Sequence, residues 1–145
     1  CPAKLLCLEI TESAIMEHIS RAADELAVLR EMGVQVALDD FGKGYSSLNY
    51  LNRLPISCLK VDRAFVAGIA GAGDADSLVR TILDLGRSLD LIVVAEGVET
   101  REQYEFLLAH GCDRLQGHLL ARAEPVDAFE VLLAEGVVGP ADVGP

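Results

Sequence analysis

The 145-residue sequence predicts an α/β fold with a parallel sheet, built from about five units in which a strand is followed by a helix. Three observations support this prediction. Short apolar runs alternate with segments of helical periodicity along the chain. No two neighbouring runs are joined by the short turn that closes a β-hairpin. Acidic residues stand at the ends of several runs, and the carboxyl ends of parallel strands meet at one edge of a sheet.

The N-terminal third contains two expected strands with a helix between them. Residues 5–10 and 34–38 are short apolar runs, and we expect the second strand to be buried on both faces, as in a sheet covered by helices. Leucine and alanine at helical spacing predict a helix over 21–32. We expect Ser20 to be its N-cap and Gly33 to end it.

The middle of the chain repeats this pattern. Residues 47–54 carry leucines at three-residue steps and predict a short helix that ends at Pro55. A third strand is expected over 58–62. Because side chains alternate across a strand, Lys60 and Asp62 should share one face of it.

The clearest strand of the second half is 91–96, where five apolar residues lead to Glu96. Before it, a glycine- and alanine-rich segment over 67–76 predicts a mobile loop, and leucine spacing predicts a helix over 77–89. After it, Thr100 has capping-box spacing with Gln103. That helix is expected to end at Gly111 and to bury Tyr104, Leu107 and Leu108.

A weak strand at 114–117 is followed by a last helix that begins at Pro125. From there we expect a single domain over 1–135 and a flexible tail over 136–145.

The composition restricts the class of protein. A net charge of −11 argues against nucleic acid as a partner, because nucleic-acid binding needs a basic face. No apolar run approaches the roughly 20 residues that span a bilayer, and we expect no signal peptide in residues 1–4, because no long apolar segment follows their charged residue. Four cysteines without a CxxC pair argue against a zinc site or disulfide framework. We therefore expect a cytoplasmic location, although regions of the parent protein outside this sequence could anchor it to a membrane.

Charged residues at the expected strand ends are the strongest indication of a functional site. Adjacent carboxylates at the end of a buried strand repel each other unless a cation lies between them, although Asp40 followed by a glycine loop is also compatible with an ordinary turn. We expect the residues of this set to meet at one edge of the sheet: Glu9, Asp39, Asp40, Lys60, Asp62 and Glu96.

This set of ligands suits a pair of hard divalent ions. Carboxylate oxygens without accompanying His or Cys favour Mg²⁺ or Mn²⁺ over zinc. Two such ions, roughly 3.5–4 Å apart and bridged by Asp39, would activate a water and stabilise the charge of a phosphoryl displacement. Lys60 could orient that water, or it could form an ion pair with Asp62 or Asp40, and the two roles are compatible.

Five motifs in order over almost the whole chain resemble those of EAL domains, the bacterial phosphodiesterases of cyclic di-GMP. They are LEITES (8–13), DDFGKGYSSL (39–48), LKVD (59–62), AEGVET (95–100) and QG (116–117). The resemblance implies an incomplete TIM-like barrel that hydrolyses cyclic di-GMP to pGpG by two-metal catalysis.

The resemblance also implies a role for each matching residue. The metal ligands would be Glu9, Asp39, Asp40 and Glu96, and the catalytic residues would be Lys60, Glu96 and Asp40. Four further residues would support the substrate or the loop: Glu12, Asp62, Glu99 and Gln116. Among them, Glu12 would anchor the loop after the aspartate pair, Glu99 would lie on the rim of the site, and Gln116 would assist the attacking water or the ligand.

The sequence departs from the EAL pattern in several places. Lys43 stands where the family usually has a small residue, and 118–123 match loosely the stretch that usually carries an aromatic residue after Gln-Gly. The Glu-Ala-Leu signature and a metal-binding Asn would lie upstream of Cys1. Because a closed barrel takes about 250 residues, we expect open edges at the first and last strands and exposed apolar inner faces.

This incomplete barrel leads to expectations about partners. The fragment either pairs with a second copy through its open edges or belongs to a longer chain with upstream sensory or diguanylate-cyclase domains. With two metal ligands missing, we expect the fragment itself to be inactive.

Two other functions remain open from the sequence. A degenerate EAL domain would bind cyclic di-GMP or a protein partner as a receptor without hydrolysis. Another metal-dependent barrel, such as an enolase-like or glycerophosphodiester enzyme, would also place acids at strand ends but would not predict this ordered set of motifs.

Overall fold

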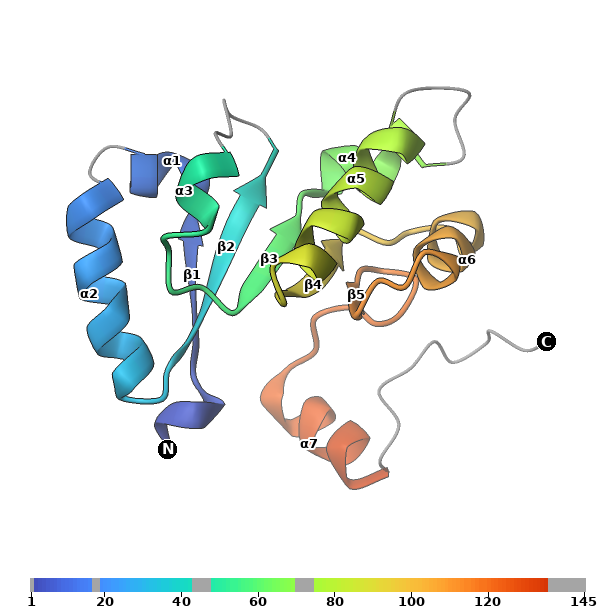
Figure 1. Cartoon of the computed structure of the whole chain (residues 1–145). Helices are drawn as coiled ribbons and strands as arrows, with labels where there is room; N and C mark the ends of the chain where they lie inside the picture. Colours follow the sequence, from blue (N-terminus) through green and yellow to red (C-terminus); the bar gives the residue numbers. More distant parts are fainter. Residues whose placement is uncertain (1, 17–18, 43–47, 70–74, 136–145) are drawn as a thin grey trace.

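A computed structural model describes residues 2–16, 19–42, 48–69 and 75–135. Its centre is one sheet of five parallel strands whose spatial order follows the sequence (Figure 1). The strands are β1 (Cys7–Thr11), β2 (Gln35–Phe41), β3 (Cys58–Val61), β4 (Ile92–Glu96) and β5 (Arg114–Gln116). Each consecutive pair is parallel, which confirms the predicted α/β class.

The strands are connected by helical segments. These are α1 (Glu12–Met16), α2 (Ile19–Glu31), α3 (Leu48–Leu51), α4 (Arg63–Ala67), α5 (Ala75–Ser88), α6 (Arg101–Ala109) and α7 (Val126–Glu135), after an N-terminal 3₁₀ turn, η1 (Ala3–Leu5). Helices α2, α3, α5, α6 and α7 were predicted. The five-residue helices α1 and α4 were not, because each is too short to show a helical period.

One face of the sheet forms the core against the helices. Side chains on this face of the three central strands are almost completely buried: Val36, Leu38, Leu59, Val61, Val93 and Ala95. The register of the strands places another set on the opposite, inner face: Cys7, Glu9, Ala37, Asp39, Cys58, Lys60, Val94, Glu96, Arg114 and Gln116. The inner face is therefore the one that carries the charged residues.

Strand β2 is buried on both faces at its centre, as predicted. Val36 and Leu38 point into the core, and Ala37 on the inner face is only 1% exposed. Cys58 on β3 is also buried, so the expectation of an exposed apolar inner face is wrong at the centre of the sheet. Large apolar side chains are exposed elsewhere, at several places that include Leu5 next to β1 and Val126 on α7.

Three details of the predicted elements are corrected by the structure. Ser20 lies within α2, which already begins at Ile19, so it is not the N-cap. Leu108 on α6 is 51% exposed and does not contribute to the core, whereas Leu107 is fully buried. The third strand ends at Val61, and Asp62 caps the following helix. The expected loop over 67–76 and tail over 136–145 lie largely or wholly outside the described residues.

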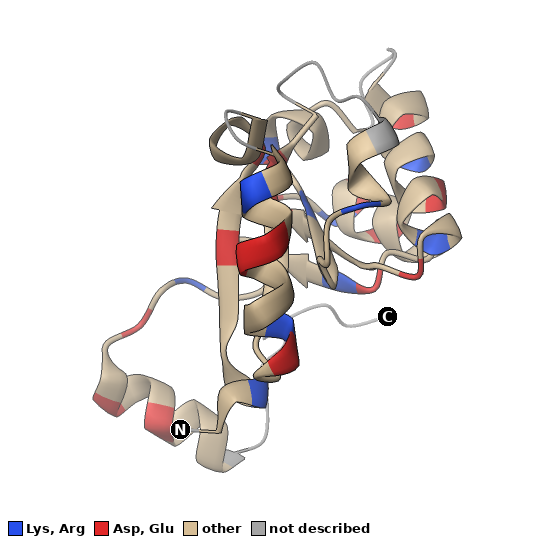
Figure 2. Cartoon of the chain, turned by 60° about the vertical axis from the view of Figure 1, so that its left-hand side comes forward, with Lys and Arg blue, Asp and Glu red and all other residues tan. Residues whose placement is uncertain are grey.

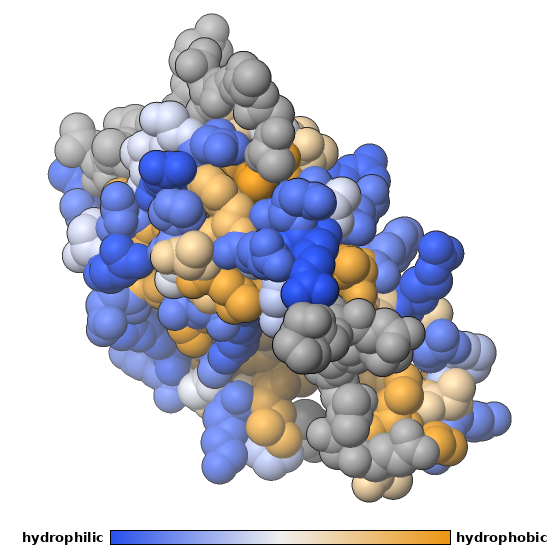
Figure 3. All heavy atoms as spheres, turned by 90° about the vertical axis from the view of Figure 1, so that its right-hand side faces the viewer, coloured by the Kyte–Doolittle hydropathy of each residue, from blue (hydrophilic) through white to orange (hydrophobic). Residues whose placement is uncertain are grey.

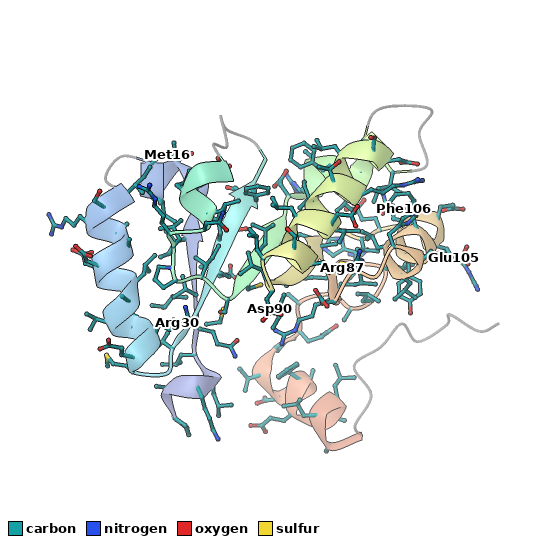
Figure 4. The ribbon with its side chains drawn as sticks, viewed as in Figure 1. Met16, Arg30, Arg87, Asp90, Glu105 and Phe106 are labelled. Atoms are coloured by element: carbon teal, nitrogen blue, oxygen red, sulfur yellow. The ribbon has the colours of Figure 1, made fainter. Side chains whose placement is uncertain are left out.

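The helices carry most of the surface charge. Figure 2 shows acidic and basic residues along α2. Arg21 on this helix forms an ion pair with Glu25 at 2.9 Å. Arg87 on α5 is labelled in Figure 4. Its side chain donates to the carbonyl of His110 at the end of α6, at 3.1 Å, and so connects the two helices. Seen from the side in Figure 3, hydrophobic side chains reach the surface at several places.

In the described part of the chain, no helix has the length and apolarity needed to cross a membrane.

Candidate active site

Lys60 is the centre of a cluster of charges drawn from four strands. Its Nζ lies 2.7 Å from Glu9 Oε2 on β1, 2.5 Å from Glu96 Oε1 on β4 and 3.6 Å from Asp39 Oδ1 on β2. The lysine side chain is 7% exposed, and the three carboxylates are more open to solvent. Residues that are far apart in the sequence therefore converge at one end of the sheet.

The ammonium group of Lys60 is held in its charged form. Burial alone would lower the pKa of this lysine, but the hydrogen bonds to Glu9 and Glu96 and the charge of Asp39 outweigh burial and raise it above its ordinary value. One positive charge thus faces three negative ones. The cluster therefore remains acidic overall. The sequence predicted an ion pair of Lys60 with Asp62 or Asp40, but the structure pairs Lys60 with Glu9, Asp39 and Glu96 instead.

The aspartate pair lies in an irregularity of β2. The register between β2 and β3 shifts between Leu38 and Phe41, as in a β-bulge. Asp40 has a φ of +57°, a left-handed conformation that Asp tolerates better than most residues, and its backbone N–H donates to Asp39 Oδ1 at 2.9 Å. The bulge therefore fixes the direction of the Asp39 carboxylate next to Lys60.

Glu12 supports the segment that follows the aspartate pair. It is 3% exposed; its Oε2 accepts from the backbone N–H of Gly42 at 3.3 Å, and its Oε1 accepts from the hydroxyl of Tyr50 at 3.0 Å. These contacts hold the chain on both sides of residues 43–47. That segment, which includes Lys43, lies outside the described residues. Gly42 has a φ of +100°, and a Cβ there would lie 2.8 Å from the ring of Phe65.

Asp62 lies at the end of β3 but points into the start of α4. Its carboxylate accepts from the backbone N–H of Ala64 at 2.9 Å, as an N-cap does, and the residue is buried. The cap positions Arg63, the first residue of α4, beside the end of β4. A Cβ on Gly97 would lie only 2.5 Å from Cβ of Arg63, so the two segments are in close contact.

The loops after β4 and β5 are joined through their backbones. Val98 N–H donates to the carbonyl of Gln116 and Leu119 N–H donates to the carbonyl of Val98, both at 3.0 Å. A Cβ at position 117 would lie 2.2 Å from the Val98 backbone, so only Gly117 allows this approach. We call this pairing of 97–99 with 116–119 the loop clasp.

A cleft of about 290 Å³ lies beside the loop clasp. Its lining includes Arg63, Glu96, Glu99, Gln116 and His118. The structure thus places Glu99 and Gln116, both predicted from the sequence, in the same cleft as Glu96. Arg63, Tyr50 and His118 were not predicted as site residues, and only the position of Arg63 directly after LKVD could have suggested it.

The donor atoms of the cluster suit a hard divalent cation. Glu9, Asp39 and Glu96 offer only carboxylate oxygens, the ligands that Mg²⁺, Mn²⁺ and Ca²⁺ prefer. Among the described residues, no three His, Cys, Asp or Glu side chains are already arranged around a common metal position. The ammonium of Lys60 lies between these carboxylates instead.

Curated proteins of similar sequence come from bacterial signalling. The chain is 50% identical over 122 residues to the bifunctional diguanylate cyclase/cyclic di-GMP phosphodiesterase MucR of Pseudomonas aeruginosa, covering 84% of the chain and 18% of MucR. It is 45% identical over 131 residues to the cyclic di-GMP phosphodiesterase NbdA of the same species, covering 90% and 17%. An uncharacterized signaling protein of Caulobacter vibrioides is 47% identical over 132 residues, covering 91% and 16%. The chain therefore spans less than a quarter of the length of these relatives.

Solved structures agree with the sequence relatives. The PaMucR phosphodiesterase in complex with cyclic di-GMP superimposes with a TM-score of 0.85 at 48% identity, covering 88% of this chain and 52% of that one. The EAL domain of Mycobacterium smegmatis DcpA gives 0.88 at 44% identity, covering 94% and 61%. A manganese and cyclic di-GMP complex of Klebsiella pneumoniae BlrP1 gives 0.78 at 34% identity, covering 84% and 31%.

The five parallel strand–helix units, the carboxylates gathered around Lys60 and these similarities agree with one another. The model of the EAL domain family matches residues 1–123, and the chain belongs to that family.

Proposed function

We propose that the protein containing this chain is a phosphodiesterase that hydrolyses cyclic di-GMP to linear pGpG with two Mg²⁺ or Mn²⁺ ions. The observation that carries the proposal is the convergence of Glu9, Asp39 and Glu96 on Lys60 at the carboxyl ends of neighbouring strands. An acidic cluster of this kind accepts a phosphodiester only when cations lie between the carboxylates and the phosphate. The names of MucR and NbdA and the cyclic di-GMP in solved relatives support the same substrate.

Each residue of the cluster has a place in this proposal. Glu9, Asp39, Asp40 and Glu96 hold the ions, which, when bound, lower the pKa of a water and neutralise charge that develops on the phosphate. Lys60 keeps its proton at neutral pH, so it acts as a fixed positive charge that orients the water or a phosphate oxygen.

The remaining site residues act around this centre. Gln116 lies in the cleft beside Glu96, from which its amide can orient the water or the ligand. Glu12 and Asp62 hold the backbone on which the site is built, through Gly42, Tyr50 and Ala64.

The test is product formation by the full-length natural protein. We expect pGpG to appear from cyclic di-GMP with Mg²⁺ or Mn²⁺, and the Glu96→Gln variant to be roughly 100-fold slower or worse, as for the loss of one electrostatic group of an active site. Glu105→Gln is the matched control, because Glu105 is an exposed α6 residue paired with Arg101. An equal rate in Glu96→Gln would contradict the proposal. Binding of cyclic di-GMP without any product would support the receptor function instead.

The edges of the sheet carry a related proposal. Within the described chain, β1 and β5 each pair with only one neighbouring strand, and Leu5, Leu6 and Leu8 near β1 are exposed. We propose that in isolation residues 1–145 form a homo-oligomer through these edges. Because they do not include the Glu-Ala-Leu signature and the metal-binding Asn of the EAL pattern, we expect little or no phosphodiesterase activity from them. Size-exclusion chromatography with mass measurement tests the homo-oligomer, and a compact monomer would contradict it.

The relatives suggest a setting for the domain, which is part of this proposal. Because the chain spans so little of MucR and NbdA, we place it downstream of sensory or diguanylate-cyclase domains in its parent protein. We also propose a cytoplasmic location, where cysteines such as Cys7, Cys58 and Cys112 stay reduced.

A further inference from the structure

A cavity of about 420 Å³ lies between α5 and the end of α6, on the outside of the sheet. Its lining includes Arg80, Asp84, Arg87 and His110. Because the strands are parallel, each of these helices returns from the carboxyl end of one strand to the amino end of the next. The cavity is therefore displaced from the strand ends around Lys60, and it shares no lining residue with the cleft beside the loop clasp.

Phe106 on α6, labelled in Figure 4, supports one of the arginines from behind. The guanidinium carbon of Arg80 lies 5.3 Å from the centre of the Phe106 ring. Phe106 is not part of the lining, so Arg80 presents to the cavity the side of its guanidinium that faces away from this ring. Among the described residues, no ion pair engages Arg80. A guanidinium held in this way can stack a second planar ring on its open face.

Arg87 offers hydrogen-bond donors to an anion in the same cavity. It lies seven residues after Arg80, about 10 Å further along α5. Its guanidinium donates to Asp84 Oδ1 at 2.9 Å and to the carbonyl of His110 at 3.1 Å, which fixes its position. Three of its five N–H groups are left over from these two bonds. Since Asp84 balances only one of the two arginines, the lining keeps a net positive charge with His110 neutral.

A planar ring joined to a phosphate fits this arrangement. The volume of the cavity lies within the range of small-molecule pockets, roughly 300–1,000 Å³, and arginine N–H groups pair with phosphate oxygens. We propose that the cavity binds a nucleoside monophosphate, with its base stacked on Arg80 and its phosphate bound by Arg87. Leu108 and Ala109 line the rest without polar side chains, so the identity of the base is not selected. The site does not depend on the proposed phosphodiesterase activity.

The test is photolabelling of the full-length natural protein with 8-azidoadenosine 5′-monophosphate, in EDTA so that no divalent ion recruits phosphate to the Lys60 cluster. Peptide mass spectrometry locates the label. We expect saturable labelling of α5 or of residues 106–111, suppressed more strongly by AMP than by ribose 5-phosphate, which has the phosphate but no base. At a probe concentration far below saturation, Arg80→Met and Arg87→Met should each reduce this labelling roughly 10-fold or more.

Arg80→Lys separates stacking from charge. It keeps the positive charge without the planar face, so in this variant AMP should compete no better than ribose 5-phosphate. Arg80 is exposed, so its variants should fold even if the loss of Arg87, which connects α5 to α6, is destabilising.

Arg21→Met, which removes an arginine from α2, is the matched control and should be labelled like wild type. Three outcomes would each overturn the proposal: no saturable label on this segment, undiminished label in Arg80→Met, or equal competition by ribose 5-phosphate and AMP in wild type. None of them bears on whether the protein hydrolyses cyclic di-GMP.

Discussion

Lys60 is the residue on which the site depends, because a buried ammonium group must be balanced by opposite charge. Glu9, Asp39 and Glu96 provide that balance from three other strands. Because the folded state raises the pKa of Lys60 despite the opposing effect of burial, its contribution to stability is complete below the ordinary pKa of lysine. It is lost only as the pH rises through the higher folded value. The contribution should therefore be constant across neutral pH.

Replacing Lys60 by Met should lower the free energy of unfolding by about 1–3 kcal/mol in EDTA, because three carboxylates lose their shared cation. Added Mn²⁺ should restore more stability to the variant than to wild type, since metal and ammonium compete for the same oxygens. Urea unfolding with and without Mn²⁺ measures both effects. Arg21→Met, at an exposed ion pair, is the control and should change stability little. Equal responses of Lys60→Met and wild type to Mn²⁺ would contradict this account.

The cysteines should differ in their reactivity toward alkylating reagents. Burial raises the pKa of Cys58 to about 11 and that of Cys112 to about 11, so near pH 8 both remain protonated and shielded, whereas Cys7 is exposed. Iodoacetamide should therefore modify Cys7 first, as followed by peptide mass spectrometry. Labelling of Cys58 at the rate of Cys7 would show that the inner face of the sheet is open at its centre.

At the scale of elements, several local signals in the sequence predicted the structure correctly, although Ser20 is not the N-cap it was expected to be. The capping box of Thr100 and Gln103 is formed as predicted, and Gly33 ends α2 with a positive φ, because both depend on residues close together in the chain. The bulge at Asp39 and the loop clasp depend on neighbouring strands and loops. No spacing in the sequence indicates either one.

The loop clasp should be sensitive to one methyl group. Gly117→Ala would place Cβ 2.2 Å from the Val98 backbone, so the loops must separate, at a cost of about 1–3 kcal/mol in the free energy of unfolding. Since the cleft is built on this contact, affinity for cyclic di-GMP should fall as well. Ala123→Gly, which also changes the cleft lining by one methyl group, is the control. Wild-type stability and affinity in Gly117→Ala would show that the loops are not held by this approach.

For the molecule as a whole, the sequence predicted the convergence of acids because parallel strands end at the same edge of a sheet. That rule brought Glu9, Asp39 and Glu96 together without any knowledge of side-chain positions. It could not identify them as the partners of Lys60, since this depends on strand register and on the bulge of β2. That Arg63 lines the cleft could not be predicted for a similar reason: its position comes from packing against Gly97.

The central claim, that these carboxylates are a metal site facing a phosphodiester, is tested most directly by anomalous diffraction. Crystals of the full-length protein with Mn²⁺ and cyclic di-GMP should show manganese bound by Glu9, Asp39 and Glu96, with the phosphate beside it and Lys60 released from at least one carboxylate. Manganese bound elsewhere, with these three carboxylates still held only by Lys60, would contradict the account.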